Sequence, residues 1–292
     1  MRVSGRIRAE NQVRMDEQRV ARHSERDPPK RCRRHGDRAC RVDGRSDTVS
    51  VRTPKSRAAG WLIIVATLIG FASAAWLLVL RSFGSDRPAR YEEQVRRIER
   101  RRAEAAPIHP VLITGSSYME LWTTSHRDLA PLETVNIGIG GTKARDHLQF
   151  LERMIIPFAP RVLIVYIGSN DINGLPFYSK SPEATVQLVV EYIAAVRRRL
   201  PSTRIYYIAI TETPSRARVR DDIREANRRL QLLSGQSGDF AFIDTAPALL
   251  TPKGEIDPTL FRLDRLHLND KGYELFASTV RAALSAEYGA TT

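Results

Sequence analysis

The stretch PVLITGSSYMELW (residues 110–122) begins with a run of apolar residues and passes through Gly115 into two serines. Such a run is typical of a buried strand, and Gly-Ser-Ser is typical of a turn that starts a helix. A serine in this position is common for structural reasons alone. Ser117 therefore becomes a candidate nucleophile only if the rest of the chain supplies a base, an orienting acid and an oxyanion hole.

Strand and helix patterns alternate after this stretch. Five short apolar runs are expected to be buried strands, at 111–115, 134–138, 161–168, 204–210 and 239–244. Helical patterns are clearest at 182–200, at 219–233 and from Lys271 to Glu287. This alternation predicts βαβ units with helices on both faces of a parallel sheet. We therefore expect residues 110–288 to form one α/β domain with three αβα layers and a five-stranded parallel sheet.

Clusters of polar residues and glycines follow several of these runs. The clusters are Ser116 with Ser117, NIGIGGT (136–142), GSND (168–171) and, before the last helix, LDRLHLND (263–270). Sites in open parallel sheets form at the carboxyl ends of the strands. We therefore expect these four clusters to meet at one edge of the sheet.

The residue types in these clusters fit acyl transfer. The Ser117 hydroxyl needs a base, and His267 is the candidate because imidazole both takes and returns a proton near neutral pH. Asp264, three residues before His267, is expected to hold the imidazole in one tautomer, as in a Ser-His-Asp triad. The expected oxyanion donors are the backbone N–H groups of Ser117 and Gly141 and the side-chain amide of Asn170. No metal or cofactor is expected.

Residues 110–286 resemble the SGNH hydrolases, also called the GDSL esterase/lipase family. The four family blocks correspond to Ser117, to Gly141 in NIGIGG, to Asn170 in GSND, and to Asp264 with His267 in DRLH. The sequence HLNDKGY (267–273) is typical of the segment that begins at the histidine in that family. The resemblance implies a flavodoxin-like αβα fold, the SGNH hydrolase fold, and metal-free hydrolysis of esters.

The first block departs from the usual family pattern. Ser116 stands where Asp is usual, and Tyr118 stands where Ile or Leu is usual. The block resembles a bacterial branch written G-S-S-S, in which a Trp stands seven residues after the Gly, as Trp122 does after Gly115. Counting from that glycine favours Ser117 over Ser116 as the nucleophile.

A serine esterase or lipase acting through an acyl-enzyme on Ser117 is the expected function. Two alternatives remain open: a cell-surface glycan O-acetyl esterase or acetyltransferase of the same fold, and an inactive binding module. The substrate would be a small-molecule, lipid or glycan ester. The loops FYSK (177–180) and 213–219 are expected at the same sheet edge, where they could shape an acyl pocket. No catalytic role is expected for the other scattered histidines, His109, His126 and His147.

Most of the net charge of +13 belongs to the first part of the chain, because residues 1–60 hold 17 Lys/Arg against 8 Asp/Glu. The remainder after residue 80 is close to balanced, and no nucleic-acid recognition motif accompanies the basic tail. We expect residues 1–60 to be disordered. One hypothesis places the biological start nearer Val51. Cys32 and Cys40, both in this tail, match no common zinc spacing.

Residues 61–80, WLIIVATLIGFASAAWLLVL, form an apolar run of membrane-spanning length. We expect a single-pass signal anchor in the inner (cytoplasmic) membrane. The Lys/Arg counts on its two sides are nearly tied, so an extracytoplasmic position of the domain rests on what lone N-terminal spans usually do. Residues 81–109 are expected to be a linker, in which YEEQVRRIERRRAEAA (91–106) forms a solvated stalk helix.

Overall fold

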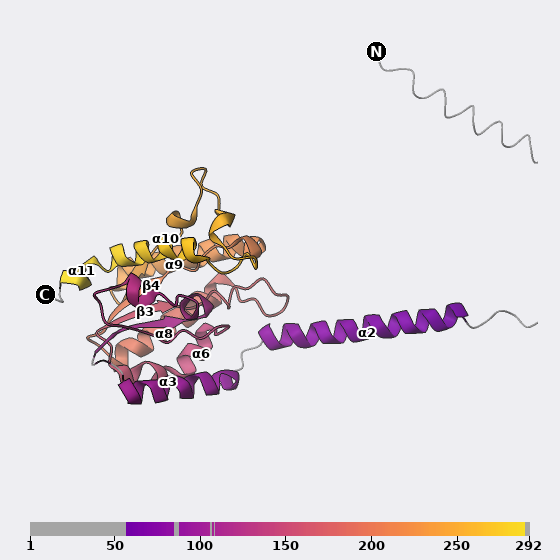
Figure 1. Cartoon of the computed structure of the whole chain (residues 1–292), viewed down its shortest axis with the longest axis horizontal. Coiled ribbons are helices and arrows are strands. Elements are labelled where there is room, and N and C mark those ends of the chain that lie inside the picture. The colour runs from indigo at the N-terminus through magenta and orange to yellow at the C-terminus, as the bar shows by residue number, and fades with distance from the viewer. Residues whose placement is uncertain (1–56, 85–87, 106, 108, 290–292) are drawn as a thin grey trace, which may run out of the picture. The chain divides into compact units, whose positions relative to one another are not determined.

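The computed structural model describes residues 57–84, 88–105, 107 and 109–289. Residues 1–56 of the expected basic tail, which include both cysteines, lie outside the described residues, whereas residues 57–60 are helical and not disordered as expected. Five strands form one parallel sheet in the order β2-β1-β3-β4-β5, of which β3 and β4 are labelled in Figure 1. The strands are β1 (Val111–Gly115), β2 (Thr134–Asn136), β3 (Val162–Tyr166), β4 (Arg204–Ile208) and β5 (Ala241–Ile243). The predicted parallel five-stranded sheet is confirmed, and its strand order is that of flavodoxin-like folds.

The central strands are apolar and covered on both faces. All five residues of β1 and all five of β3 are buried, as expected for parallel strands with helices on either side. Most of the observed strands end one or two residues before the expected ones. At β3 the reason is local, since Gly168 has a φ of +99° and turns the chain out of the sheet.

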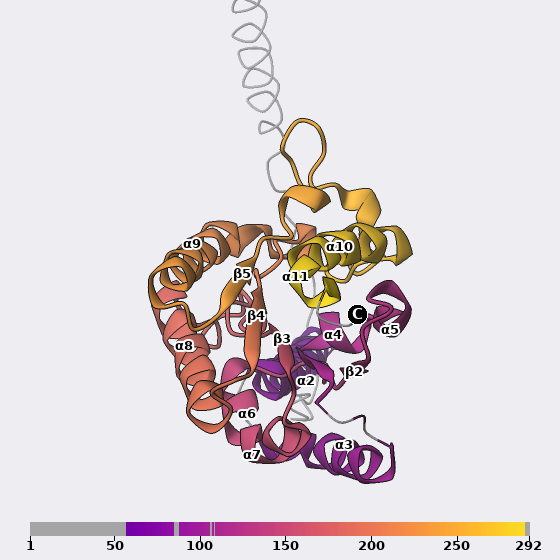
Figure 2. The ribbon, with the colours of Figure 1, turned by 90° about the vertical axis from the view of Figure 1, so that its left-hand side faces the viewer.

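Helices cover both faces of the sheet (Figure 2). One face packs against α6 (Ala144–Gln149), α7 (Leu151–Met154), α8 (Pro182–Arg199) and α9 (Arg220–Ser237). The opposite face packs against α4 (Ser117–Glu120), α5 (Ser125–Asp128) and α10 (Asp270–Ala283). Short 3-10 turns lie in the connections, at Ile156–Phe158, Pro214–Val219, Pro247–Leu249 and Pro258–Leu260. The fold is thus the three-layer αβα arrangement that the alternation predicted.

The charged segment expected to be a solvated stalk is instead part of the domain, and that expectation is wrong. It forms a short 3-10 turn (Pro88–Tyr91) followed by α3 (Glu92–Ala105). Tyr91, Val95 and Ile98 are buried in the core that α7 also lines. The helix has one narrow apolar stripe among many charges, which is enough to bury one face. Two of its carboxylates, Glu92 and Glu99, pair with Arg153.

The carboxyl-terminal helix is interrupted, whereas one continuous helix to Glu287 was expected. It ends at Ala283 and restarts as α11 (Ser285–Tyr288). The break turns Glu287 inward. Its buried carboxylate accepts a hydrogen bond from Tyr206 and forms ion pairs with Arg161 and Arg204. These pairs satisfy a charge that burial alone would strongly disfavour.

The helix α2 (Arg57–Gly84) contains the apolar run identified in the sequence. Its window Gly60–Val79 has a mean hydropathy of 2.5, and no part of that window is buried. Within the described residues it is the one helix long and apolar enough to cross a membrane.

Candidate active site

The site forms where the chain leaves β1 and β3 toward opposite faces of the sheet. After β1 the chain enters α4 on one face, and after β3 it continues to α8 on the other face. In open parallel sheets, ligand sites form at the carboxyl ends of strands whose connections diverge in this way. The backbone of Gly115, at the end of β1, can lie close to that of Tyr166, at the end of β3, because glycine has no side chain. A Cβ at Gly115 would lie 2.3 Å from the carbonyl oxygen of Tyr166.

Ser117, His267 and Asp264 are joined in a continuous chain of hydrogen-bond contacts. The Oγ of Ser117 lies 2.8 Å from Nε2 of His267. On the other side of the ring, Nδ1 of His267 lies 2.7 Å from Oδ2 of Asp264. A carboxylate accepts only, so Nδ1 carries the proton and Nε2 of the neutral ring is free to accept from the serine hydroxyl. The structure therefore brings together the three residues chosen from the sequence.

Asp264 is held in its ionised form. Partial desolvation raises its pKa, but the backbone and side-chain hydrogen bonds from His267 and the backbone N–H of Leu266 outweigh that and lower the pKa to about 2. The Oδ1 atom accepts from the N–H groups of Leu266 and His267 at 2.9 and 3.0 Å. The carboxylate therefore both orients the imidazole and fixes the loop that carries it.

The two adjacent serines differ sharply in their surroundings. Ser116 is buried, and its Oγ lies 3.2 Å from the Oγ of Ser169. Ser117, at the start of α4, is partly exposed and faces His267. This geometry agrees with the register chosen by counting from Gly115.

Tyr118, noted in the sequence only as a departure, links the serine and histidine segments. Its hydroxyl donates to the carbonyl of Leu266 at 2.8 Å, and its ring stacks on Tyr166 with centroids 4.9 Å apart. Tyr273 in turn donates to the carbonyl of Tyr118 at 2.8 Å. Residues from β3, α4 and α10 thus hold the backbone beside His267. A lone Tyr gives no sequence signal for such a role.

The three expected oxyanion donors lie on three segments of this edge. Ser117 is the first residue of α4, so its N–H has no acceptor within the helix. Gly141 has a φ of +81°, and its carbonyl accepts from the hydroxyl of Tyr91 at 2.7 Å. Asn170 uses one amide hydrogen for the carbonyl of Thr142 at 3.1 Å and has a second to offer.

Arg216, in the expected loop 213–219, orients the Asn170 amide. Its Nη2 donates to Oδ1 of Asn170 at 3.0 Å, and its Nη1 donates to the carbonyl of Ser169. Since only the oxygen of an amide accepts, these contacts point the Asn170 NH₂ group the other way. The sequence placed this loop at the edge but did not single out Arg216 among many arginines.

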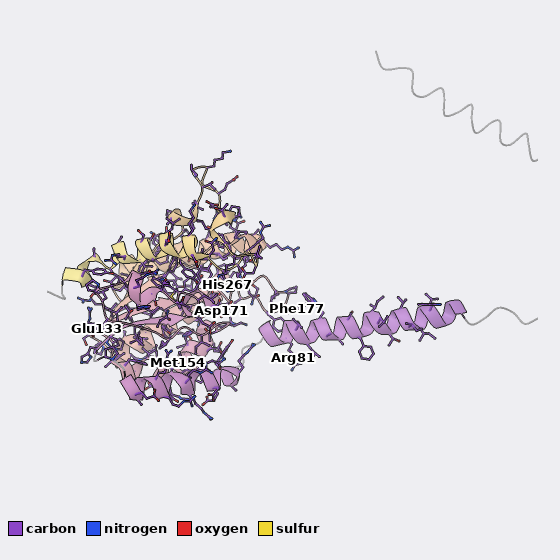
Figure 3. All side chains as sticks on the ribbon, in the orientation of Figure 1. Arg81, Glu133, Met154, Asp171, Phe177 and His267 are labelled. Atoms are coloured by element: carbon purple, nitrogen blue, oxygen red, sulfur yellow. The ribbon has the colours of Figure 1, made fainter. Side chains whose placement is uncertain are left out.

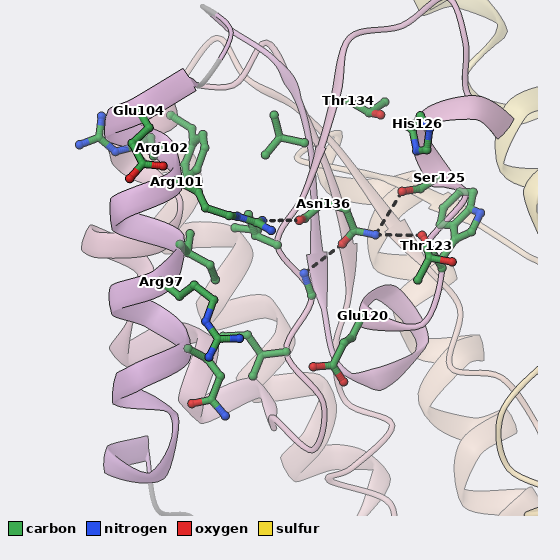
Figure 4. Close-up of a pocket in the computed structure, with 18 residues that line it drawn as sticks. Arg97, Arg101, Arg102, Glu104, Glu120, Thr123, Ser125, His126, Thr134 and Asn136 are labelled. Atoms are coloured by element: carbon green, nitrogen blue, oxygen red, sulfur yellow. Dashed lines mark hydrogen bonds between the residues drawn. The ribbon is translucent and has the colours of Figure 1, made fainter.

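A separate cavity of about 700 Å³ lies along the outer edge of β2 (Figure 4). Arg97 and Arg101 of α3 reach into it, and Arg101 donates to the carbonyl of Asn136 at 3.2 Å. Its lining includes none of Ser117, Asp264 and His267. Within the described residues, no group of three or more His, Cys, Asp or Glu is arranged to hold a metal.

Residues 114–275 match the model of the GDSL-like lipase/acylhydrolase family. The chain belongs to this family. It is a carboxylic ester hydrolase, and its fold is the SGNH-like fold of solved family structures. No curated protein matches this GDSL-like acylhydrolase.

Solved structures resemble the GDSL-like acylhydrolase in fold. A Streptococcus pneumonia protein assigned as a platelet activating factor has a TM-score of 0.60 at 20% identity, covering 72% of this chain and 99% of that one. A GDSL-like lipase from Bacteroides thetaiotaomicron has a TM-score of 0.55 at 16% identity, covering 70% and 99%. A catalytic mutant of an acetylxylan esterase from Geobacillus stearothermophilus has a TM-score of 0.51 at 16% identity, covering 60% and 94%.

Proposed function

We propose that this GDSL-like acylhydrolase is a membrane-anchored serine esterase that acts through an acyl-enzyme on Ser117. The observation that carries the proposal is the contact chain from Ser117 Oγ through His267 to Asp264, with distances of 2.8 and 2.7 Å. Both distances are within hydrogen-bond reach for proton transfer and orientation.

The first half-reaction forms the acyl-enzyme. Ser117 Oγ attacks the ester carbonyl carbon while Nε2 of His267 takes the hydroxyl proton, and Asp264 stabilises the imidazolium that results. The oxyanion is stabilised by the N–H groups of Ser117 and Gly141 and by the Asn170 amide. When the tetrahedral intermediate collapses, the bond to the leaving alkoxide breaks and His267 returns the proton to it.

The second half-reaction releases the acid. A water gives a proton to Nε2 of His267 and attacks the acyl carbon, and a second tetrahedral intermediate collapses with Ser117 Oγ as the leaving group. His267 returns the proton to that oxygen, which restores the enzyme. An alcohol of a glycan in place of the water would make the same site an acyltransferase.

The acetylxylan esterase neighbour supports the assignment of roles. Its catalytic mutants replace a serine, an aspartate and a histidine, and that aspartate precedes the histidine by three positions. The spacing of Asp264 and His267 is the same.

Labelling with a fluorophosphonate tests the mechanism. The full chain in detergent is treated with the probe and assayed with p-nitrophenyl esters from acetyl to dodecanoyl. We expect the probe to modify Ser117 and the chain to turn over esters. Both should be abolished in Ser117→Ala and His267→Ala. A label on Ser116 would reject the register, whereas a folded chain without label or turnover would favour the binding module. Turnover of acetyl esters alone would favour the glycan O-acetyl esterase.

Membrane anchoring by α2 is the second part of the proposal. The helix is long enough to span the hydrocarbon core, and its apolar side chains are exposed rather than packed in a core. We place the catalytic domain on the extracytoplasmic side of the inner membrane. Resistance of the chain to alkaline extraction, together with protease access to the domain from the outer face of spheroplasts, is expected. If the protease cleaved the domain only after lysis, the domain would lie on the cytoplasmic side instead.

A further inference from the structure

Two large apolar side chains stand fully in solvent beside the candidate active site. Phe177 and Leu263 are each 103% exposed relative to a reference residue. Outside α2, the next most exposed large apolar side chain among the described residues is Leu232, at 52%. Singly exposed apolar side chains are common on protein surfaces, but these two stand on loops that also carry candidate site residues.

Phe177 stands on a loop that projects from the Asn170 segment. The loop is closed at its base by Asn173, whose Nδ2 donates to the carbonyl of Asn170 at 2.9 Å. It is closed again by the N–H of Lys180, which donates to the carbonyl of Asp171 at 2.8 Å. The side chain is therefore held at the outer end of a segment rooted in the oxyanion region.

Leu263 stands on the loop that carries the other half of the site. The N–H of Arg262 donates to the carbonyl of His267 at 2.7 Å and closes a tight turn. Leu263 is inside this turn and directly precedes Asp264. Phe177 and His267 lie toward the same end of the domain, opposite Glu133, which directly precedes β2 (Figure 3).

The covalent path to α2 keeps the start of the domain near the end of that helix. Gly84 ends α2, and Pro88 begins the 3-10 turn that enters the domain, so four peptide steps bound their separation to about 15 Å. That turn ends at the buried Tyr91, whose hydroxyl donates to the carbonyl of Gly141. The segment around Gly141, which carries one of the expected oxyanion donors, therefore cannot lie far from the point where a membrane-spanning α2 leaves the bilayer.

Exposed arginines lie beside the two apolar residues. Arg262 and Arg265 flank Leu263, and Arg218 lies in the neighbouring loop; all three are exposed. Exposed carboxylates lie among them, with Asp264 and Asp270 on the same segment as Leu263 and Asp222 beside Phe177, so this surface carries charges of both signs. When apolar side chains enter the interface of a bilayer, arginines beside them can reach the lipid headgroups.

We propose that the active-site edge docks on the bilayer that holds α2, with Phe177 and Leu263 inserted into its interface. The acyl group then comes from an amphiphile resident in that leaflet, such as a lipid or lipid-linked ester, rather than from a freely diffusing ester. This inference rests on the proposed anchor and esterase activity, and it names the substrate class of the same site.

Depth-dependent quenching tests the docking. The full chain, with Cys32 and Cys40 replaced by Ser, carries a single environment-sensitive label at Phe177→Cys, Leu263→Cys or Leu232→Cys. It is reconstituted in vesicles of phosphatidylcholine and phosphatidylglycerol, with and without nitroxide-labelled lipid. Strong quenching at 177 and 263 but not at 232 is expected. Equal quenching at all three positions, or quenching at none, overturns the proposal.

Kinetics provide a second readout. The double variant Phe177→Ser/Leu263→Ser should lower turnover of a bilayer-embedded ester by about tenfold or more, because two large side chains lose their burial. Leu232→Ser is the matched control. Hydrolysis of p-nitrophenyl acetate and fluorophosphonate labelling of Ser117 report the esterase separately. If Ser117 is labelled and the double variant changes turnover of the bilayer-embedded ester no more than turnover of p-nitrophenyl acetate, the docking alone is rejected. If Ser117 of the unmodified chain is not labelled, the proposed function itself is rejected.

Discussion

Arg216 donates a hydrogen bond to the amide oxygen of Asn170 at 3.0 Å and so decides which end of that amide faces the reaction. We expect Asn170→Ala to lower kcat by about 10²–10³ with little change in KM, as for the loss of one oxyanion donor. Arg216→Ala should lower kcat by about tenfold through the same amide. In the Asn170→Ala background, Arg216→Ala should lower kcat little further. Additive losses in this double-mutant cycle would show that Arg216 acts by another route.

The hydroxyl of Tyr118 supports the histidine loop, so Tyr118→Phe should lower kcat several-fold and leave KM unchanged. The lost hydrogen bond to Leu266 is worth about 1 kcal/mol. Tyr206→Phe is the matched control, because Tyr206 donates to Glu287 at 2.8 Å, outside the site. It should lower the melting temperature without changing kcat. Equal kcat values for the two variants would remove the positioning role from Tyr118.

Asp264→Asn keeps the shape of the side chain but not its charge. The amide cannot hold Nδ1–H as a carboxylate does and cannot stabilise the imidazolium, so kcat should fall by about 10²–10⁴. The loss should be smaller than for Ser117→Ala or His267→Ala. Because the pKa of Asp264 is lowered to about 2, its contribution to stability is complete above its ordinary value and is lost as the pH falls through about 2. Steady-state rates and acid titration of the folded chain measure the two effects.

Gly141→Ala tests the geometry of the oxyanion segment. The φ of +81° disfavours any side chain, and the new Cβ would lie 3.3 Å from the Tyr91 hydroxyl. We expect a stability loss of about 1 kcal/mol and at least a tenfold fall in kcat. Gly238→Ala is the control, since Gly238 has a φ of +69° at the end of α9 but nothing within contact distance. It should lose similar stability and no activity.

Burial of His147 predicts a pH-dependent loss of stability. Desolvation lowers the pKa of His147 from 6.5 to about 4, so between these values the unfolded chain binds a proton that the folded chain does not. Stability should therefore fall as the pH decreases from 6.5, by about 3 kcal/mol once the pH reaches 4. Its Nε2 contacts the Thr142 hydroxyl at 2.9 Å. His147→Gln can keep that hydrogen bond, and its unfolding midpoint should depend less on pH over this interval.

Several features of the site followed from local sequence patterns. Apolar runs of strand length, separated by helical periodicity, predict a parallel sheet because few other arrangements bury both kinds of element. That topology brings Ser117 and His267 to one edge although 150 residues separate them. The pairing of Asp264 with His267 did not depend on the topology of the sheet, since two residues three positions apart in one turn are already within hydrogen-bond reach of each other.

Long-range packing decided what the sequence did not reveal. The charges of α3 hid a narrow apolar stripe, and only the tertiary structure shows that Val95 and Ile98 of this stripe are buried in the core of the domain. Tyr118 and Arg216 act through backbone or amide groups distant in sequence, which leave no mark on composition or periodicity. Local pattern thus determined the five strands and the long helices, the register of Ser117 and the Asp264–His267 pair. Tertiary structure alone decided what supports them, because hydrogen bonds between distant segments exist only after the chain has folded.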